Sequence, residues 1–243
     1  MTFYNKDKLT EKERYDVTFK SFSNNFDEEH GSASIPLYYR APYICYEEVI
    51  SRYAKGKCKV LEIGSGSGRH TKFLLNKDIE VVASDISSAS IELLKKKFFK
   101  VDIKNLKIKK IDMEEINLDI NYFDIVCCAG SLSYGDTFKV KSEIYKTLKP
   151  GGYFICVDSL NDNFIYKFFR YLAYLANKRT ISTIINMPTK KTIDSYDDYF
   201  YRKEIYFFGL AVWLVPFFKF ILSDSSINSL LAKIDKIFKT KYY

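Results

Sequence analysis

A glycine-rich turn is the segment with the clearest capacity for chemistry. It comprises Gly64, Ser65, Gly66, Ser67 and Gly68. Glycines let the backbone approach a ligand closely, and the amide groups of a helix that begins there point at that ligand. A dinucleotide-binding turn, G-x-G-x-x-G, would need glycine where this chain has Arg69. The carboxylate of Glu62, which precedes the turn, would repel a diphosphate and attract an aminium or sulfonium group, so the pattern favours a cationic ligand.

Two further acidic residues follow short apolar runs. Asp85 ends the second run, and a carboxylate there can accept hydrogen bonds from both ribose hydroxyls of a nucleoside. The alternative for Asp85 is a helix N-cap. Asp112 ends the third run and could accept from an adenine amino group, with Met113 against the ring. The alternative for Asp112 is a surface carboxylate that closes the strand.

Polar residues also follow the later apolar runs. The segment 158–163 places Asp158, Asn161 and Asn163 together, a set that suits sugar hydroxyls, with Asp158 as a general base. The alternative is an Asx-rich turn that caps the next helix, above all for Asn163. Ser133 and Tyr134, which follow the fourth run, are further candidates for substrate contact.

The chain has two histidines. His30 could act as a base if the N-terminal segment forms a lid, and His70 is expected to pack near the cofactor. Tyr39 and Arg40 could hold the cofactor or the substrate carboxylate. Alternatively, Tyr39 and Arg40 dock the N-terminal segment onto the sheet.

The elements that must position these residues alternate between strand and helix patterns. Strands are expected at 59–63, 80–83, 106–111, 123–129 and 153–157, with helices at 69–75, from 87 or 88 to about 98, and at 138–148. Continuous apolar runs such as 123–129 indicate strands that are buried on both faces. The sequence therefore predicts an α/β fold with a doubly wound, mostly parallel sheet.

Two flanking regions complete the expected organisation. Residues 1–55 are interpreted as a helical lid segment, and residues 56–243 as the main domain, with a cofactor half at 56–158 and a substrate-side elaboration at 159–243. Within that elaboration, 163–176 is expected to be helical and 181–198 to be a polar loop. The apolar stretch 205–222 is long enough to suggest a membrane-spanning helix, but Pro216 and Lys219 interrupt it. A late strand followed by a buried helix is preferred, and peripheral membrane contact stays open.

Composition narrows the classes of function. The net charge is +8, but lysine dominates over arginine. Because lysine, asparagine, isoleucine, phenylalanine and tyrosine share A/T-rich codons, genome bias explains much of this charge, and no nucleic-acid partner is expected. The five cysteines show no zinc-type spacing, so no metal site is expected and the thiols are interpreted as reduced. The polar N-terminus predicts no signal peptide and a cytoplasmic location.

The ordered motifs resemble those of class I S-adenosylmethionine-dependent methyltransferases. Residues 62–68 resemble the first motif, 123–126 the fourth-strand motif and 148–152 the turn into the fifth strand. The resemblance implies S-adenosylmethionine as cofactor and a seven-stranded sheet whose last strand is antiparallel. The implied cofactor-binding residues are Glu62, Gly64, Ser65, Gly66, Gly68, His70, Asp85, Ile86, Asp112, Met113, Ala129 and Gly130.

The segment 158–188 also resembles a branch of methyltransferases linked to bacterial surface-polysaccharide synthesis, including capsule and O-antigen. That branch usually reads Asn-His-Asn where this chain has Asp162 between two asparagines. The resemblance implies O-methylation of a sugar or nucleotide-linked sugar. Asp158 is then the preferred base, and the implied substrate contacts are Tyr39, Arg40, Ser133, Tyr134, Asn161, Asn163, Tyr166 and Arg170.

Four rival functions remain as alternatives. A nicotinamide-dependent oxidoreductase would need a Tyr-x-x-x-Lys pair, whereas Tyr166 is followed by Arg170 at that spacing. A nucleobase amine methyltransferase would need an Asn-Pro-Pro-Tyr type motif, and residues 129–132 read Ala-Gly-Ser-Leu. A methyltransferase for another small molecule, or a non-catalytic cofactor-binding module at the membrane, is the remaining alternative. The oligomeric state is not predicted.

Overall fold

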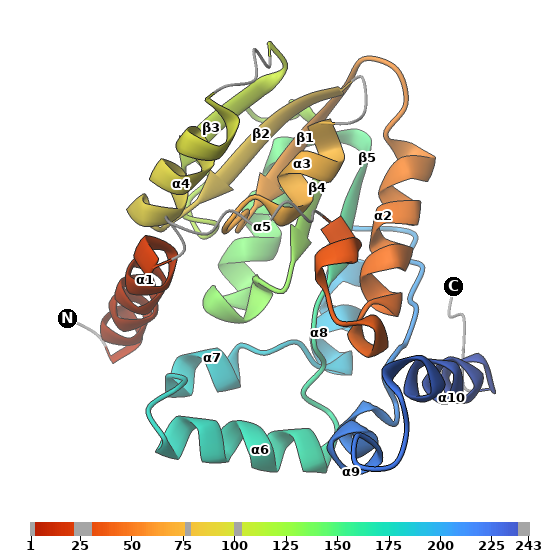
Figure 1. Ribbon diagram of the computed structural model, residues 1–243. Coiled ribbons are helices and arrows are strands. Elements are labelled where there is room, and N and C mark those ends of the chain that lie inside the picture. Colours follow the sequence, from red (N-terminus) through yellow and green to blue (C-terminus); the bar gives the residue numbers. More distant parts are fainter. Residues whose placement is uncertain (1–2, 22–30, 76–78, 100–103, 238–243) are drawn as a thin grey trace.

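The computed structural model describes residues 3–21, 31–75, 79–99 and 104–237. Its centre is a parallel sheet of five strands in the order β3-β2-β1-β4-β5 (Figure 1). The strands are β1 Cys58–Ile63, β2 Ile79–Asp85, β3 Leu106–Lys110, β4 Phe123–Ala129 and β5 Leu148–Val157. The expected parallel α/β fold is confirmed. The described residues contain five strands, and an antiparallel last strand is not among them.

Helices cover both faces of the sheet. Ile50 of α2 (Ala41–Tyr53) and Leu74 of α3 (Arg69–Leu75) pack against Val60 on one face. Ile144 of α5 (Thr137–Thr147) packs against Leu61 on the other. Consecutive strand residues thus enter different cores, which explains why β1 and β4 are mostly buried and mostly apolar rather than alternating.

Helix α4 (Ser88–Phe98) packs beside β3 through Leu94 and Phe98. Its first turn is capped by Ser87, whose side chain accepts from the amide of Ser90, as expected for a serine at this position. The following helix α5 is similarly capped by Asp136. Strand β5 begins directly after α5 and includes the segment 149–152 that was expected to be a separate turn.

Helix α1 (Phe3–Ser21) lies beyond the edge at which the strands end, as Figure 1 shows. Phe19 of α1 packs with Ala89 and Leu93 of α4. At the other side, Asp7 accepts from the amide of Ser182 at 3.0 Å. The helix therefore joins the α4 region to the C-terminal part of the chain.

The C-terminal part consists of helices and irregular segments. They are α6 Phe164–Leu175, α7 Ile181–Ile185, α8 Lys190–Asp194, α9 Val215–Phe218 and α10 Asp224–Ile237, with 3-10 turns η5 Ser195–Asp198 and η6 Val212–Leu214. The loop expected at 181–198 is wrong, because Thr189 and Thr192 form a capping box that starts α8. In the part of the chain that the structure describes, no helix is long and apolar enough to cross a bilayer.

The strand expected in 205–222 is also wrong. Gly209 has a positive φ of 72°, which breaks an extended run. The carboxylate of Asp235 in α10 accepts from the amides of Gly209 and Leu210, at 3.0 and 3.3 Å. These backbone donors are therefore satisfied by a side chain instead of by a neighbouring strand.

Candidate functional site

The glycine turn lies where β1 and β2 end side by side. Ile63 of β1 pairs with Ser84 of β2. The amide of Gly66 donates to Oδ2 of Asp85 at 2.9 Å, and the amide of Ser87 donates to Oδ1 at 2.8 Å. Burial raises the pKa of Asp85 even though these amides favour its charged form. The glycine turn and the acidic residue that ends β2 thus meet at the carboxyl edge of the sheet.

Close packing explains why the turn needs its glycines. Gly64 and Gly68 have φ of 66° and 77°. A Cβ on Gly64 would come within 2.5 Å of the Cβ of Ser131, and one on Gly68 within 2.5 Å of a Leu94 methyl carbon. The first glycine therefore lets the loop after β4 approach, and the last lets α4 approach. By contrast, a Cβ on Gly130 would meet nothing within 4 Å.

Glu62 is a buried carboxyl behind the turn, with 3% of its surface exposed. Oγ1 of Thr71 donates to its Oε2 at 2.5 Å. Desolvation raises the pKa of Glu62 to about 8, the Thr71 hydrogen bond opposes the shift, and the nearby Asp85 adds to it. A cationic group bound beside Glu62 would favour the charged carboxylate, so this environment fits the aminium or sulfonium ligand expected from the sequence.

Helix α1 packs against the glycine turn and the residues that follow β2. Asp16 accepts from Oγ of Ser87 at 2.5 Å and from the amide of Ala89 at 3.2 Å. The ring of Phe19 stands 3.3 Å from the position of a Cβ on Gly66. The sequence carried no signal for these contacts, because α1 has no strong apolar face of its own and its partners lie far along the chain. Helix α1 thus packs against the glycine turn and the start of α4, and the role of residues 1–55 as a lid stays a prediction.

The same helix engages two predicted ligand contacts. Nζ of Lys8 lies 2.5 Å from Oδ2 of Asp112, so the expected acceptor for adenine is ion-paired in this structure. The hydroxyls of Tyr15 and Tyr134 are 2.5 Å apart. Tyr134 and its buried neighbour Ser133 do not line the cavity described below. Their contact with substrate stays a prediction.

The remaining cofactor candidates line the same edge of the sheet or pack beside it. Ser65 donates through its amide and its hydroxyl to the carbonyl of Ser84, at 2.9 and 3.0 Å. Ile86 follows Asp85 directly. The amide of Gly130 donates to the carbonyl of Val157, which holds the end of β4 against β5. Ala129 closes β4. Met113 lies 3.1 Å from the position of a Cβ on Gly135, which places it beside the loop after β4.

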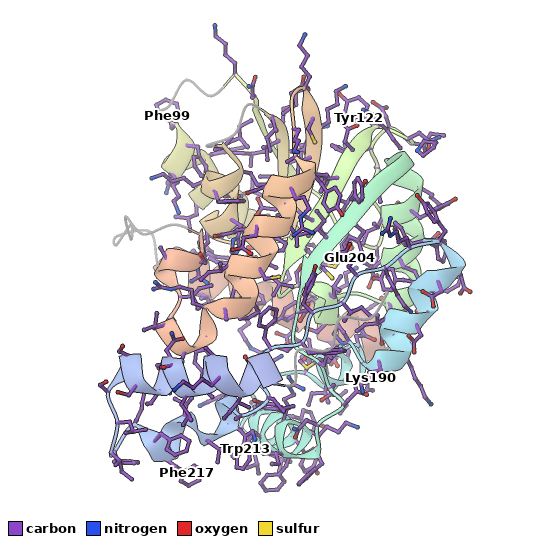
Figure 2. All side chains as sticks on the ribbon, turned by 90° about the vertical axis from the view of Figure 1, so that its right-hand side faces the viewer. Phe99, Tyr122, Lys190, Glu204, Trp213 and Phe217 are labelled. Carbon is purple, nitrogen blue, oxygen red and sulfur yellow. The ribbon has the colours of Figure 1, made fainter. Side chains whose placement is uncertain are left out.

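A large cavity of about 1640 Å³ opens beside β5. It exceeds the range of roughly 300–1,000 Å³ that is usual for small-molecule pockets. Aromatic residues from α2, β5 and the C-terminal part line much of it, including Tyr43, Tyr53, Tyr153, Phe154, Tyr196 and Phe200. In Figure 2 the segment that carries Lys190 and Glu204, two further lining residues, runs beside β5. Sequence reasoning missed these aromatic residues, because they come from elements far apart in the chain.

Asp158 joins this cavity to the carboxyl edge of the sheet. It follows β5 and lines the cavity together with Gly130 and Leu132. Its Oδ2 accepts from the amide of Leu132 at 3.0 Å, and its Oδ1 accepts from the amide of Ser159 at 2.7 Å. Burial raises the pKa of Asp158, while these amides, Arg170 and Arg179 oppose the rise. The predicted base is therefore held at the end of β5, facing the cavity.

Asn161 does not line the cavity and instead forms hydrogen bonds to neighbouring residues. It is 8% exposed, and its Nδ2 donates to the carbonyl of Ile184 at 3.2 Å. Its Oδ1 accepts from Nη1 of Arg170 at 2.8 Å. Arg170 itself lines the cavity, and burial lowers the pKa of its guanidinium, with Arg179 adding to the effect. The structure thus brings Arg170 to the cavity and uses Asn161 to hold it.

The other predicted substrate contacts divide in the same way. Asn163 caps α6 through the amide of Ile165, which is the Asx-turn alternative, although it also lines the cavity. Tyr166 and Tyr39 line the cavity, and the hydroxyl of Tyr166 donates to the carbonyl of Gly209. Arg40 instead donates to the carbonyls of residues 33 and 35. It therefore organises the turn before α2, and neither its predicted contact with a ligand nor docking onto the sheet is among these contacts.

Of the two histidines, His70 is buried in α3. Its ring stacks on Tyr43 with centroids 5.6 Å apart, and its Nδ1 lies 3.3 Å from Oε1 of Glu47. Glu47 also accepts from the amide and hydroxyl of Ser32, at 2.7 and 2.8 Å. His70 thus helps to pack α3 against α2 behind the turn. His30 lies outside the described residues.

Comparison with known proteins agrees with this geometry. Residues 61–156 match the family described as "Methyltransferase domain". A curated uncharacterized methyltransferase of Schizosaccharomyces pombe is 30% identical over 105 residues, which cover 43% of this chain and 40% of that protein. The ubiquinone/menaquinone biosynthesis C-methyltransferase UbiE of Rickettsia akari is 28% identical over 138 residues, 53% of this chain and 56% of that protein. The chain thus spans about half the length of these relatives.

The fold extends the likeness beyond the matched segment. A solved structure from Galdieria sulphuraria, described as a candidate sarcosine dimethylglycine methyltransferase, superposes with a TM-score of 0.59 at 15% identity. The superposition covers 94% of this chain and 95% of that one. The family match is thus confined to residues 61–156, whereas the likeness of fold to this structure extends over nearly the whole chain.

Proposed function

We propose that this chain is an S-adenosylmethionine-dependent methyltransferase that methylates a hydroxyl group of an acceptor bound in the aromatic cavity. The observation that carries the proposal is the position of Asp158. It lies at the carboxyl edge of the sheet and lines the cavity together with Gly130, which follows the neighbouring strand β4. The cavity therefore reaches the edge of the sheet at which the glycine turn and Asp85 also lie.

The residues present fit the cofactor. Asp85 offers a carboxylate at the end of β2 for ribose hydroxyls, and buried Glu62 offers a partner for a positive charge. The space beside Gly130 is open, because a Cβ added at that glycine would meet no atom within 4 Å. Asp112 and Met113 would contact the adenine, which requires Lys8 to exchange its partner. S-adenosylmethionine supplies a methyl group that is already activated on a sulfonium.

The protein is then left with positioning the acceptor and taking up its proton. Asp158 suits the second role, because burial raises its pKa and so makes its carboxylate a stronger base than an exposed aspartate. Two backbone amides hold its side chain in place. Arg170, fixed by Asn161 and by the carbonyl of Leu160, offers a cation to an anionic part of the acceptor.

For the acceptor we favour a sugar, carried on a nucleotide or another phosphate-bearing group, of the kind used in surface polysaccharides. Aromatic rings that line the cavity offer stacking surfaces, while Asp158, Asp162 and Asn163 offer hydrogen-bond partners for hydroxyls. The cavity volume of about 1640 Å³ leaves room for more than a single monosaccharide. The resemblance of 158–188 to polysaccharide-linked methyltransferases supports the same class.

A second candidate is C-methylation of an aromatic ring. The relative UbiE is named as a C-methyltransferase of ubiquinone and menaquinone biosynthesis. An aromatic, largely apolar lining such as that formed by Tyr153, Phe154 and Phe200 would also hold an aromatic acceptor.

The test uses methyl-labelled S-adenosylmethionine with two acceptor panels, nucleotide sugars and hydroquinones, and follows label transfer. We expect transfer to a nucleotide sugar and a loss of kcat on the order of 10² to 10⁴ in Asp158→Asn. Binding of S-adenosylhomocysteine should be unchanged in that variant, which also shows that it folds. Asp119→Asn is the matched control, because Asp119 is exposed and does not line the cavity. Transfer to hydroquinones alone, or full activity in Asp158→Asn, would contradict the proposal.

A further inference from the structure

Helix α6 turns its apolar residues outward. None of its residues is buried, although it is rich in aromatic and aliphatic side chains. The most exposed of them are Phe164, Phe168, Phe169, Tyr171 and Leu175, each with more than half of its surface exposed. An amphipathic helix of a globular protein normally packs such a stripe against the core. Here the stripe has no covering element among the described residues.

A second exposed apolar segment lies beside α6. It comprises the end of α9 and the residues after it, and includes Phe217, 66% exposed, Phe220, 91% exposed, and Ile221, 81% exposed. The hydroxyl of Tyr166 in α6 donates to the carbonyl of Gly209, which ties α6 to the stretch that leads into η6 and α9. Both views place α6 and α9 at the same end of the molecule, away from the sheet (Figures 1 and 2).

We call these exposed residues of α6 and of 217–221 the apolar end face. Large contiguous apolar surfaces are rare on monomeric proteins and mark sites of interaction. The only tryptophan of the chain, Trp213, stands in η6 at this end of the molecule, as Figure 2 shows. Tryptophan, tyrosine and phenylalanine are the side chains that gather at the boundary between water and lipid.

The charged residues around the apolar end face indicate which kind of partner it would bind. The segments 163–193 and 205–223 contain no aspartate or glutamate, whereas the average composition of the chain would place about six there. They do contain basic residues, among them Lys167, Lys178 and Lys219, which are exposed. The segments of this face thus carry cations and no carboxylate of their own, with Asp224 at the start of α10 as a neighbouring negative charge, and such a face complements anionic headgroups over acyl chains.

We propose that the apolar end face binds the surface of an anionic lipid bilayer, with α6 lying in the plane of the interface. The helix is 12 residues long and no described helix can cross a bilayer, so the protein lies on the membrane. Exposed phenylalanines enter the boundary between headgroups and acyl chains, and Lys167 and Lys178 face the lipid phosphates.

The apolar end face lies next to the cavity proposed to bind the acceptor. Tyr166 and Arg170 of α6, and Leu210 and Val212 before α9, line the cavity beside β5. The same elements thus form the membrane face and a wall of the cavity. An acceptor anchored in the membrane would reach the cavity over a short path. This consequence rests on the proposed function, whereas the membrane surface itself does not.

The experiment mixes the full chain with vesicles of phosphatidylcholine alone or of phosphatidylcholine and phosphatidylglycerol. Binding is followed by co-sedimentation and by the fluorescence of Trp213, the sole tryptophan. We expect binding and a blue shift with the anionic vesicles, weakened by high salt because the cationic part is screened. The double variant Phe168→Ser, Phe220→Ser should lose on the order of tenfold or more in affinity, since each ring leaves an apolar environment.

Phe99→Ser is the matched control. Phe99 is 87% exposed and lies at the opposite end of the molecule from Phe217 (Figure 2). It should bind vesicles as the parent chain does. The proposal is overturned if neutral and anionic vesicles bind equally, if the double variant binds as well as the control, or if no vesicles bind. It is also overturned if the chain dimerises without lipid and the double variant is monomeric. Because no readout is methyl transfer, failure here leaves the proposed function standing.

Discussion

Replacing Glu62 with glutamine tests the electrostatics of the cofactor crevice. The pKa of Glu62 is raised from 4.5 to about 8 by burial, so the folded state holds a proton that the unfolded state releases above pH 4.5. Stability therefore falls as the pH rises through this window. Each unit is worth about 1.4 kcal/mol, so the window from 4.5 to about 8 corresponds to a loss of about 5 kcal/mol as an upper limit.

Glutamine keeps the size of the side chain and an oxygen to accept from Thr71, but it has no proton to lose. We expect the free energy of unfolding of Glu62→Gln to fall less between pH 5 and 8 than that of the parent chain, by several kcal/mol at most. The measurement is urea unfolding at a series of pH values. Glu92→Gln, on the exposed side of α4, serves as control and should follow the parent profile.

A cation bound beside Glu62 lowers the pKa of its carboxyl group, because the cation favours the charged form. Saturating S-adenosylhomocysteine, which carries an amino group, should therefore stabilise the parent chain more at pH 8 than at pH 6. The dependence should be smaller in Glu62→Gln, and comparison of the two proteins removes the titration of the ligand itself. Parallel profiles of the parent chain and Glu62→Gln, with and without ligand, would refute the reasoning.

The remaining predictions concern the two walls of the crevice. Saturating S-adenosylhomocysteine at 100 times its Kd should stabilise the parent chain by about 2.7 kcal/mol, or roughly 5 to 11 °C in Tm. Asp85→Ala should lose this stabilisation. An undiminished shift of Tm in the variant, measured by thermal unfolding, would show that Asp85 does not hold the ligand. Gly64→Ala should cost more than Gly151→Ala by about 1–3 kcal/mol. Both have a positive φ, but only a Cβ at Gly64 meets another residue, Ser131 at 2.5 Å. Equal losses in chemical denaturation would show that the loop after β4 yields freely.

The positions of the strands along the chain and of the glycine turn could be predicted from local patterns. The apolar runs at β1 and β4 are buried on both faces as expected, and Asp85 closes β2 beside the turn. These features follow from the chain's own periodicity, because parallel strands bring their carboxyl ends to one edge of the sheet. The placement of the glycine turn beside Asp85 could therefore largely be predicted from the sequence.

The C-terminal part could not be predicted in the same way. The stretch 205–222 is apolar enough for a strand or a buried helix, yet Asp235 of α10 takes the backbone donors of Gly209 and Leu210. Likewise, the repeat of apolar residues in α6 predicts a helix but does not tell which element covers it. In the structure that face is exposed.

The sequence alone thus determined the parallel α/β fold, the glycine turn and the acidic residues that end the strands, because each depends on neighbours within a few residues. Only the tertiary structure decided that Asn161 supports Arg170, that Lys8 meets Asp112, and that the acceptor cavity is walled by aromatic rings. Those contacts join segments separated by many residues. Their formation depends on which surfaces remain unpaired after the sheet has assembled, and that information is not contained in any local pattern.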